Sequence, residues 1–294
     1  MNSTIALRTE RLVKRRADYC LGPVDLTLEH GYTYALVGPN GTGKTTLLTC
    51  CMNLTRPTSG KVELFGRSYE TGEAESRTYA AFVPDPLEGC ESFTLLEMEK
   101  FIGRWYERWD GEDYRRRAER FRIPLHKPYG RLSQGDRKKA ALTLALSTRA
   151  PLLLLDEPTN GLDLASRSQL KQMLVEDSET MERTVLMSTH SVEDIRQFAD
   201  YILLLKEGRV EGPYDKDSLS MSWRRLWLAG TAPLDMSAVP GAVEWVEAPV
   251  PYLITRDRDA ALTYLEEKGV QVTSEQPLPL DELLERLLSC KISL

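Results

Sequence analysis

Apolar runs of strand length alternate with helix-like stretches along most of this chain. The most continuous apolar runs occupy residues 32–37, 152–155, 185–188 and 201–205. Runs of this kind are typical of strands that are buried on both faces. Helix-like stretches occur at 46–52 and 137–148. Strands that alternate with helices predict an α/β fold with a largely parallel sheet covered by helices.

Shorter segments with a two-residue period predict additional strands at 5–13, 24–28 and 61–66. Residues 80–83 form one more apolar strand, which Pro84 stops.

The stretch from 93 to 121 is charged, aromatic and helix-like. Phe101, Trp105 and Trp109 recur at the spacing of one helix face. We interpret this stripe as core. The alternative is that part of the aromatic surface is a docking site.

The composition changes again after Gly212 and Pro213. Trp223 and Trp227 are spaced to share a helix face, and the remainder predicts a β-β-α-β-α unit that ends in an amphipathic helix at 280–288. We assign residues 216–294 to a small second domain.

Composition excludes several classes of protein. The chain has 294 residues, which is room for one large or two modest domains, and its 41% hydrophobic and 28% charged shares are those of a soluble globular protein. A net charge of −6 argues against nucleic acid as the main partner. No apolar run is long enough to span a membrane, and the N-terminus lacks the apolar region of a secretory signal. The 5 cysteines predict reduced thiols in a cytosolic protein, and the 3 histidines are too scattered for a metal cluster.

A glycine-rich segment, Gly-Pro-Asn-Gly-Thr-Gly-Lys-Thr, lies between the strand at 32–37 and the helix at 46–52. This context is that of a phosphate-binding loop, in which glycines let backbone N–H groups approach an anion. A lysine in such a loop reaches the β- and γ-phosphates, and the hydroxyl after it ligates Mg²⁺. The predicted nucleotide-binding residues here are Gly38, Pro39, Asn40, Gly41, Thr42, Gly43, Lys44, Thr45 and Thr46.

Four further motifs restrict the kinds of nucleotide-binding protein that this chain can be. The strand at 152–155 ends in Asp156 and Glu157, where the first carboxylate can hold Mg²⁺ and the second can orient or deprotonate water. A Leu-Ser-Gln-Gly-Asp segment at 132–136 opens a helix upstream. Downstream come an Asn-Gly-Leu-Asp segment at 160–163 and Ser-Thr-His at 188–190, where another strand ends.

This set of motifs, in this order, resembles the nucleotide-binding domain of ATP-binding cassette (ABC) proteins over about residues 1–215. The resemblance implies a P-loop fold with a mostly parallel core sheet, an antiparallel N-terminal β-subdomain and a helical subdomain at about 86–148. It implies that Gly38 to Thr45 form the Walker A loop and that Asp156 and Glu157 form the Walker B pair. It further implies roles for Ser133 and Gly135 in the phosphate-facing signature, Asp163 as the D-loop acid, His190 as the switch histidine and Tyr19 as the aromatic residue that stacks on adenine.

The family also implies an activity and its partners. We expect an ATPase that uses ATP and Mg²⁺, with composite sites made from the Walker A loop of one subunit and the signature of a second, in a homodimer or a heterodimer. A separate membrane-spanning permease would hold the protein at the cytoplasmic face of the cell membrane. A weaker resemblance of 216–294 to a domain of bacterial exporter subunits favours export, and this domain is either a stability appendage or a dimerisation or regulatory unit.

Two departures from the family pattern matter. Asp85 stands where the family usually has Gln; an acid there can still ligate Mg²⁺ or its water, and the alternative is an ordinary loop acid. Gln134 and Asp136 replace commoner signature residues. In addition, three cations, Arg137, Lys138 and Lys139, crowd the first turn of a helix, where the dipole disfavours them. An anion presented by a second subunit would favour them there.

Two rival functions remain open. One is a soluble ABC ATPase that acts outside transport; the acidic charge and the single Walker A loop disfavour its DNA-repair and translation types. The other is a regulatory module that senses ATP without turning it over, which Asp85 and the altered signature leave open.

Overall fold

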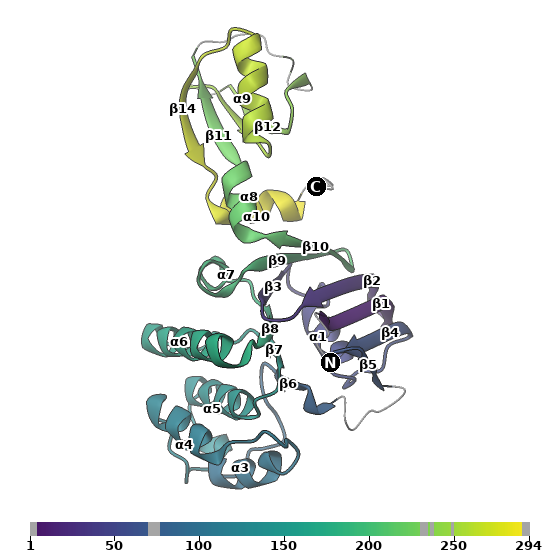
Figure 1. Ribbon diagram of the computed structural model, residues 1–294, viewed down its shortest axis with the longest axis vertical. Helices are drawn as coiled ribbons and strands as arrows, with labels where there is room; N and C mark the ends of the chain where they lie inside the picture. The colour runs from purple at the N-terminus through teal and green to yellow at the C-terminus, as the bar shows by residue number, and fades with distance from the viewer. Residues whose placement is uncertain (1–4, 70–76, 230–234, 236–237, 248–249, 290–294) are drawn as a thin grey trace. The chain divides into compact units, whose positions relative to one another are not determined.

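A computed structural model of the chain (Figure 1) describes residues 5–69, 77–229, 235, 238–247 and 250–289. The chain divides into two compact units, Met1–Pro213 and Tyr214–Leu294. Each unit is described below by itself.

A six-stranded sheet with the order β10-β9-β3-β8-β7-β6 forms the centre of the first unit. Its strands are β3 (Thr33–Val37), β6 (Ala80–Val83), β7 (Leu152–Asp156), β8 (Thr184–Ser188), β9 (Tyr201–Lys206) and β10 (Arg209–Asp215). The pairs β3–β8, β3–β9, β6–β7 and β7–β8 are all parallel. Every residue of β7 and β8 is buried, as expected for a parallel sheet that is covered on both faces. The predicted largely parallel sheet is confirmed.

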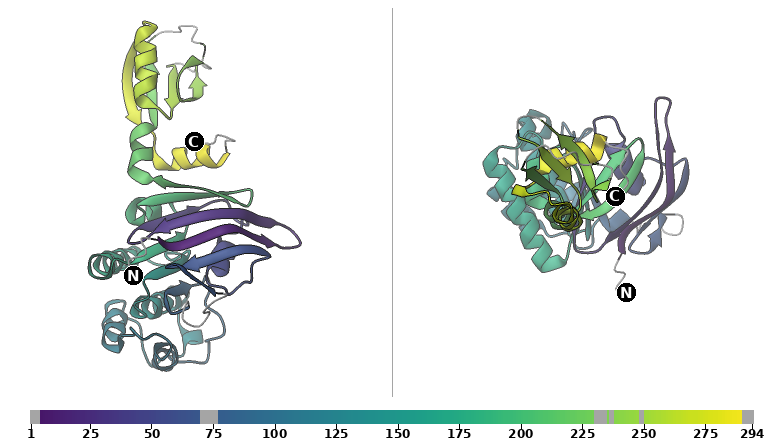
Figure 2. Two further views of the ribbon diagram at one scale, coloured as in Figure 1. Left: turned by 45° about the vertical axis from the view of Figure 1, so that its right-hand side comes forward. Right: turned by 90° about the horizontal axis from the view of Figure 1, so that it is seen from above.

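A second, antiparallel sheet has the order β2-β1-β4-β5. Its strands are β1 (Ile5–Arg15), β2 (Cys20–Glu29), β4 (Ser59–Leu64) and β5 (Arg67–Ser68). The purple strands in Figure 2 form a curved layer of their own. Helix α1 (Lys44–Cys51) contributes Leu47 and Leu48 to one apolar cluster with Leu28 of this sheet and Leu36 of the parallel sheet. The helix after the phosphate-binding loop is therefore fixed by both sheets.

Five further helices in the described part of this unit begin at side-chain caps. They are α3 (Leu95–Gly103), α4 (Gly111–Arg120), α5 (Gln134–Ser147), α6 (Leu164–Met181) and α7 (Val192–Phe198), with a short 3₁₀ turn at Tyr129–Arg131. Their caps are Thr94, Asp110, Ser133, Asp163 and Ser191, each of which accepts a backbone N–H from the first turn. Within the described ranges, no helix combines the length and the hydrophobicity needed to cross a membrane.

The predicted aromatic helix face at 101–109 is wrong. Helix α3 ends at Gly103 and α4 starts at Gly111, so Trp105 and Trp109 lie in the connection between them. Trp109 packs against Tyr114 and so closely over Gly103 that a Cβ there would lie 2.9 Å from its ring. Phe101 and Trp105 are 58% and 64% exposed, so their interpretation as core is also wrong.

The second unit holds a four-stranded antiparallel sheet with the order β12-β13-β11-β14. Its elements are α8 (Lys216–Ser222), β11 (Arg224–Leu228), β12 (Ala242–Val246), β13 (Tyr252–Thr255), α9 (Arg258–Glu267), β14 (Val272–Pro277) and α10 (Leu280–Ser289). Ala261 and Leu265 of α9 pack on Leu226, Leu228 and Leu253 of the sheet.

The prediction for the start of this unit missed one strand, β11. Trp223 follows α8 as a buried residue, and Trp227 lies on β11, so the two do not share a helix face. The overlooked signal is the two-residue period of Leu226 and Leu228, which directs both side chains into the core.

Candidate nucleotide-binding site

The loop from Gly38 to Gly43 joins the buried end of β3 to the first turn of α1. Gly43 caps the helix with a φ of 106°, a conformation that residues with a side chain rarely adopt. A Cβ at Gly38 would lie 2.4 Å from the carbonyl oxygen of Leu205. Glycine is therefore required at both positions. The loop ends at a helix N-terminus, where free N–H groups and the helix dipole favour an anion.

The Lys44 side chain lies over this loop and is 8% exposed. Its Nζ donates to the carbonyl oxygens of Gly38 at 2.7 Å and Pro39 at 3.2 Å. Burial lowers the pKa of Lys44, against the opposing pull of Glu157 and Asp156. A phosphate oxygen is a stronger acceptor for an ammonium than a neutral carbonyl, so an anion in the loop can draw this side chain to itself.

Thr45 and Asp156 meet across the first turn of α1 and the end of β7. The Thr45 hydroxyl donates to Oδ2 of Asp156 at 2.7 Å, and the Ser188 hydroxyl donates to Oδ1 at 2.5 Å. A hydroxyl beside a carboxylate is an oxygen donor set that suits Mg²⁺ when phosphates complete the shell. In the described part of the chain, no group of three or more His, Cys, Asp or Glu side chains could hold a metal without such help. These residues thus fit a metal that is bound together with a nucleotide.

Glu157 follows β7 and is placed by the neighbouring strand β8. Its N–H donates to the carbonyl oxygen of Ser188 at 3.2 Å and to the Ser188 hydroxyl at 3.1 Å. Its Oε2 lies 2.9 Å from Nδ1 of His190. Because β7 and β8 are parallel, both side chains emerge at the same sheet edge as Asp156. A carboxylate held by an imidazole can orient a water molecule and accept its proton.

Ser188 is a residue of this site that the sequence analysis did not single out. Its hydroxyl and carbonyl link Asp156 to Glu157. Its position at the end of a buried strand, directly before Thr189 and His190, was the available signal.

Tyr19 lies against the phosphate-binding loop. Its hydroxyl shares a hydrogen bond with the hydroxyl of Thr46, and its ring would lie 3.3 Å from a Cβ at Gly43. The structure thus brings Tyr19 to the loop. Its stacking on adenine stays a prediction.

Ser133, Gly135 and Asp163 lie where α5 and α6 begin. Ser133 accepts the N–H of Asp136, and Asp163 accepts the N–H of Ser166. A Cβ on Gly135 would lie 2.8 Å from the carbonyl oxygen of Gly161, so the two helix starts adjoin. Among the described residues, no hydrogen bond or ion pair joins these three to the phosphate-binding loop of the same chain.

Arg137 ends the first turn of α5, and Lys138 and Lys139 lie in its second turn. All three cations have partners within the chain. Arg137 donates to the carbonyl oxygen of Gly130, and Lys139 lies 3.0 Å from Oδ1 of Asp136. Lys138 lies 2.8 Å from Oδ1 of Asp85. The structure therefore accounts for these three cations without a second subunit. A catalytic or metal-binding role for Asp85 stays a prediction.

Known proteins are similar to this chain in sequence and in fold. The family model for ABC transporters matches residues 21–160. An ABC transporter ATP-binding protein of Bacillus subtilis, YtrB, is 27% identical over 90% of this chain and 91% of its own. The thiamine import ATP-binding protein ThiQ of Cereibacter sphaeroides is 34% identical over 70% of this chain and 91% of its own. A dimeric structure of a bacterial ABC transporter cassette superposes with a TM-score of 0.62, at 25% identity, over 71% of this chain and 98% of its own.

Proposed function

Because this chain belongs to the ABC transporter ATP-binding proteins, whose cassettes hydrolyse ATP to drive transport, we propose that it powers a separate membrane permease from the cytoplasmic side. The observation that carries the proposal is the gathering of Lys44, Thr45, Asp156 and Glu157 at one edge of the parallel sheet. The proposed direction is export, which rests on the character of the C-terminal unit alone. The import protein ThiQ matches 70% of the chain, so the cassette itself is compatible with either direction.

Each side chain at this edge has a proposed task in the hydrolysis of ATP. Thr45 and Asp156 would hold Mg²⁺, which screens the charge of the phosphates when bound. Lys44 exchanges the carbonyl oxygens of its own loop for the β- and γ-phosphates. Glu157 orients water for attack on the γ-phosphorus and accepts its proton, while the bond to ADP breaks and ADP leaves with the electron pair. His190 holds the Glu157 carboxylate in place.

The proposed site is completed by a second subunit, either another copy or a close relative. Ser133 and Gly135 make their described contacts at the start of α5 and not with the phosphate-binding loop of their own chain. Their proposed ligand is the γ-phosphate bound by the partner, with Asp163 at the same interface. The dimeric cassette that superposes on this chain supports the arrangement.

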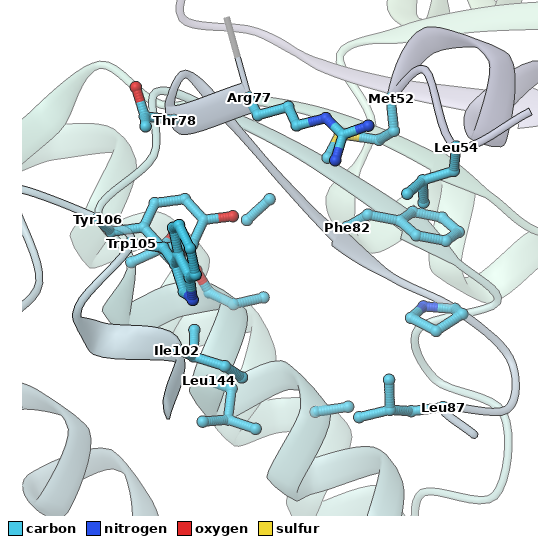
Figure 3. A pocket seen from close by; sticks show the side chains of 15 residues that line it. Met52, Leu54, Arg77, Thr78, Phe82, Leu87, Ile102, Trp105, Tyr106 and Leu144 are labelled. Atoms are coloured by element: carbon cyan, nitrogen blue, oxygen red, sulfur yellow. The ribbon is translucent and has the colours of Figure 1, made fainter. Parts of the chain in front are cut away.

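A groove of about 770 Å³ beside β6 is the proposed docking site for the permease. Its lining is mainly apolar and comes from the residues after α1, from β6 and the segments on either side of it, from α5, and from the end of α3 with the turn that follows. Figure 3 shows Ile102, Trp105 and Tyr106 on one side of it and Leu54 and Phe82 on the other. Trp105 is exposed beside this apolar groove. An exposed apolar patch of this kind usually marks a surface that a partner covers. The occupant we propose is an amphipathic cytoplasmic helix of the permease.

Co-expression with the permease encoded beside this chain tests the proposal. We expect the wild-type chain to move to the membrane fraction, and Trp105→Ala to reduce that fraction about tenfold because an aromatic anchor is lost. Val175→Ala on α6 removes a comparably exposed apolar side chain elsewhere and should have no effect. A wild-type chain that hydrolyses ATP and stays soluble with every candidate permease would favour a non-transport ATPase instead. One that binds ATP without turnover would favour a regulatory module.

A further inference from the structure

Lys138 is a buried cation with a complete set of partners. It lies on the second turn of α5, and its side chain is 5% exposed. Its Nζ lies 2.8 Å from Oδ1 of Asp85, 3.2 Å from the carbonyl oxygen of Asp156 and 3.4 Å from that of Pro84. An ammonium has three N–H bonds, so each finds an acceptor. The charge is therefore satisfied inside the chain.

Asp85 extends this contact to a third segment. Its Oδ2 accepts a hydrogen bond from Nδ2 of Asn160 at 2.9 Å. Asp85 belongs to the turn after β6, Lys138 to α5 and Asn160 to the turn after β7. The two oxygens of one carboxylate thus join α5 to the turn that leads from Glu157 to Asp163. We call these three residues, Asp85, Lys138 and Asn160, the Lys138 latch.

The latch lies directly behind the proposed metal-binding carboxylate. The carbonyl oxygen that Lys138 holds belongs to Asp156, whose side chain accepts from Thr45. The helix that carries Lys138 is capped by Ser133, and Gly135 in its first turn abuts Gly161. A shift of α5 relative to β7 would therefore move the signature residues and disturb the backbone at Asp156 together.

We propose that the Lys138 latch positions α5 against the end of β7 during ATP hydrolysis, and that Asp85 serves as the counter-ion of Lys138 and not as a ligand of Mg²⁺. This inference rests on the proposed function. Removal of the Asp85 charge leaves the Lys138 ammonium buried without a counter-ion. Removal of the Lys138 charge leaves the Asp85 carboxylate, which is 22% exposed, with the amide of Asn160 as its remaining partner. Two neutral amides at these positions would leave no unpaired charge and could still hydrogen-bond.

A double-mutant cycle on the intact chain tests the latch. Asp85→Asn and Lys138→Gln should each lower kcat at saturating ATP and Mg²⁺ by about tenfold, whereas the double variant should return to within about threefold of wild type. Lys138→Arg keeps the charge and should also stay within about threefold. The Mg²⁺ concentration for half-maximal turnover should be the same in Asp85→Asn as in Lys138→Gln, because both changes act on the same backbone at Asp156. As a control, Arg120→Gln and Glu176→Gln break an exposed ion pair between α4 and α6 and should leave kcat unchanged.

Three results would overturn the latch. Losses that multiply in the double variant mean that the two residues act independently. A higher Mg²⁺ requirement in Asp85→Asn, with Lys138→Gln unaffected, makes Asp85 a metal ligand. If the double-mutant cycle shows coupling in Tm while kcat is unchanged in all variants, the pair has only a structural role. If a single variant does not fold, the double variant decides alone. A kcat of the double variant more than about tenfold below that of wild type would also overturn the latch. A wild-type chain without turnover contradicts the proposed function itself, which keeps the two failures distinct.

Discussion

Two buried lysines of the first unit have opposite surroundings. Lys138, 5% exposed, meets the carboxylate of Asp85, while Lys44, 8% exposed, lies over neutral carbonyl oxygens of its own loop. Burial lowers the pKa of Lys44, and the attraction of the Glu157 and Asp156 carboxylates, neither of which forms an ion pair with it, does not fully offset this effect. A buried cation that already has a counter-ion supports the fold, whereas one without a direct counter-ion is available to an anionic ligand. Other charged groups of the molecule can be sorted in the same way, by whether they have a counter-ion within the chain.

The clearest case of internally satisfied charge lies between α4 and α6. Asp177 on α6 accepts from Nη2 of Arg117 at 2.5 Å and from Arg183, which is 1% exposed. Arg183 also donates to the carbonyl oxygens of Ala150 and Leu146, at 3.0 and 3.1 Å. Burial lowers the pKa of Arg183 to about 10. This network ties α4, α5 and α6 to the segments that lead into β7 and β8, and none of these bonds reaches the phosphate-binding loop.

The largest expected effect comes from breaking that network. Asp177→Asn should lower the free energy of unfolding by about 3–5 kcal/mol, because it leaves the Arg183 guanidinium buried without a counter-ion and leaves Arg117 with Asp113 alone. Chemical denaturation measures the change. Glu176→Gln, next to it on α6, breaks an exposed pair with Arg120 and should cost about 1 kcal/mol or less. Equal losses in the two variants would contradict the assignment of Asp177 as a structural anchor.

Lys44→Met should show the reverse pattern. We expect ATP turnover to fall by about 10²–10³-fold, since a charge aimed at the phosphates is lost. Stability should stay the same or rise, because a desolvated ammonium is replaced by an apolar side chain of similar length. Steady-state kinetics and denaturation on the same preparation measure both. A destabilised but fully active variant would make Lys44 a purely structural cation and contradict its assignment to the phosphates.

A smaller effect is expected at Tyr19, which carries no charge. Tyr19→Ala should weaken ATP binding by about 1–3 kcal/mol if its ring stacks on the base. Tyr19→Phe keeps the ring and removes only the hydrogen bond to Thr46, so it serves as the matched control. Titration calorimetry with ATP measures both. Similar losses in the two variants would assign the effect to the hydroxyl and not to stacking.

Local patterns predicted most of the first unit. The strands at β3, β7, β8 and β9 follow from continuous apolar runs, because a buried parallel strand needs no long-range information to be recognised. The errors at Trp105 and Trp227 arose where aromatic spacing suggested a helix. At Trp105 the capping residue Asp110 starts a new helix, and at Trp227 the packing of Leu226 and Leu228 on α9 selects a strand.

The candidate site was predictable only where its residues are neighbours in sequence. The loop from Gly38 to Thr45 and the pair Asp156 and Glu157 are contiguous motifs whose chemistry follows from residue type. The pairing of Asp85 with Lys138 joins residues that are far apart in sequence and carries no local signal. Asp85 alone suggested a ligand of Mg²⁺ or its water, or an ordinary loop acid; its pairing with Lys138 is visible only in the folded chain.

The claim on which the proposed function depends is that two subunits enclose ATP between the phosphate-binding loop of one and the signature of the other. Sedimentation of the Glu157→Gln variant tests it, because this change slows hydrolysis by about 10²–10⁴-fold and leaves Lys44 to bind the nucleotide. We predict a monomer without nucleotide and a dimer at saturating ATP and Mg²⁺, whereas a Lys44→Met and Glu157→Gln double variant stays monomeric. A Glu157→Gln chain that remains monomeric at saturating ATP, with and without the permease, would contradict the account.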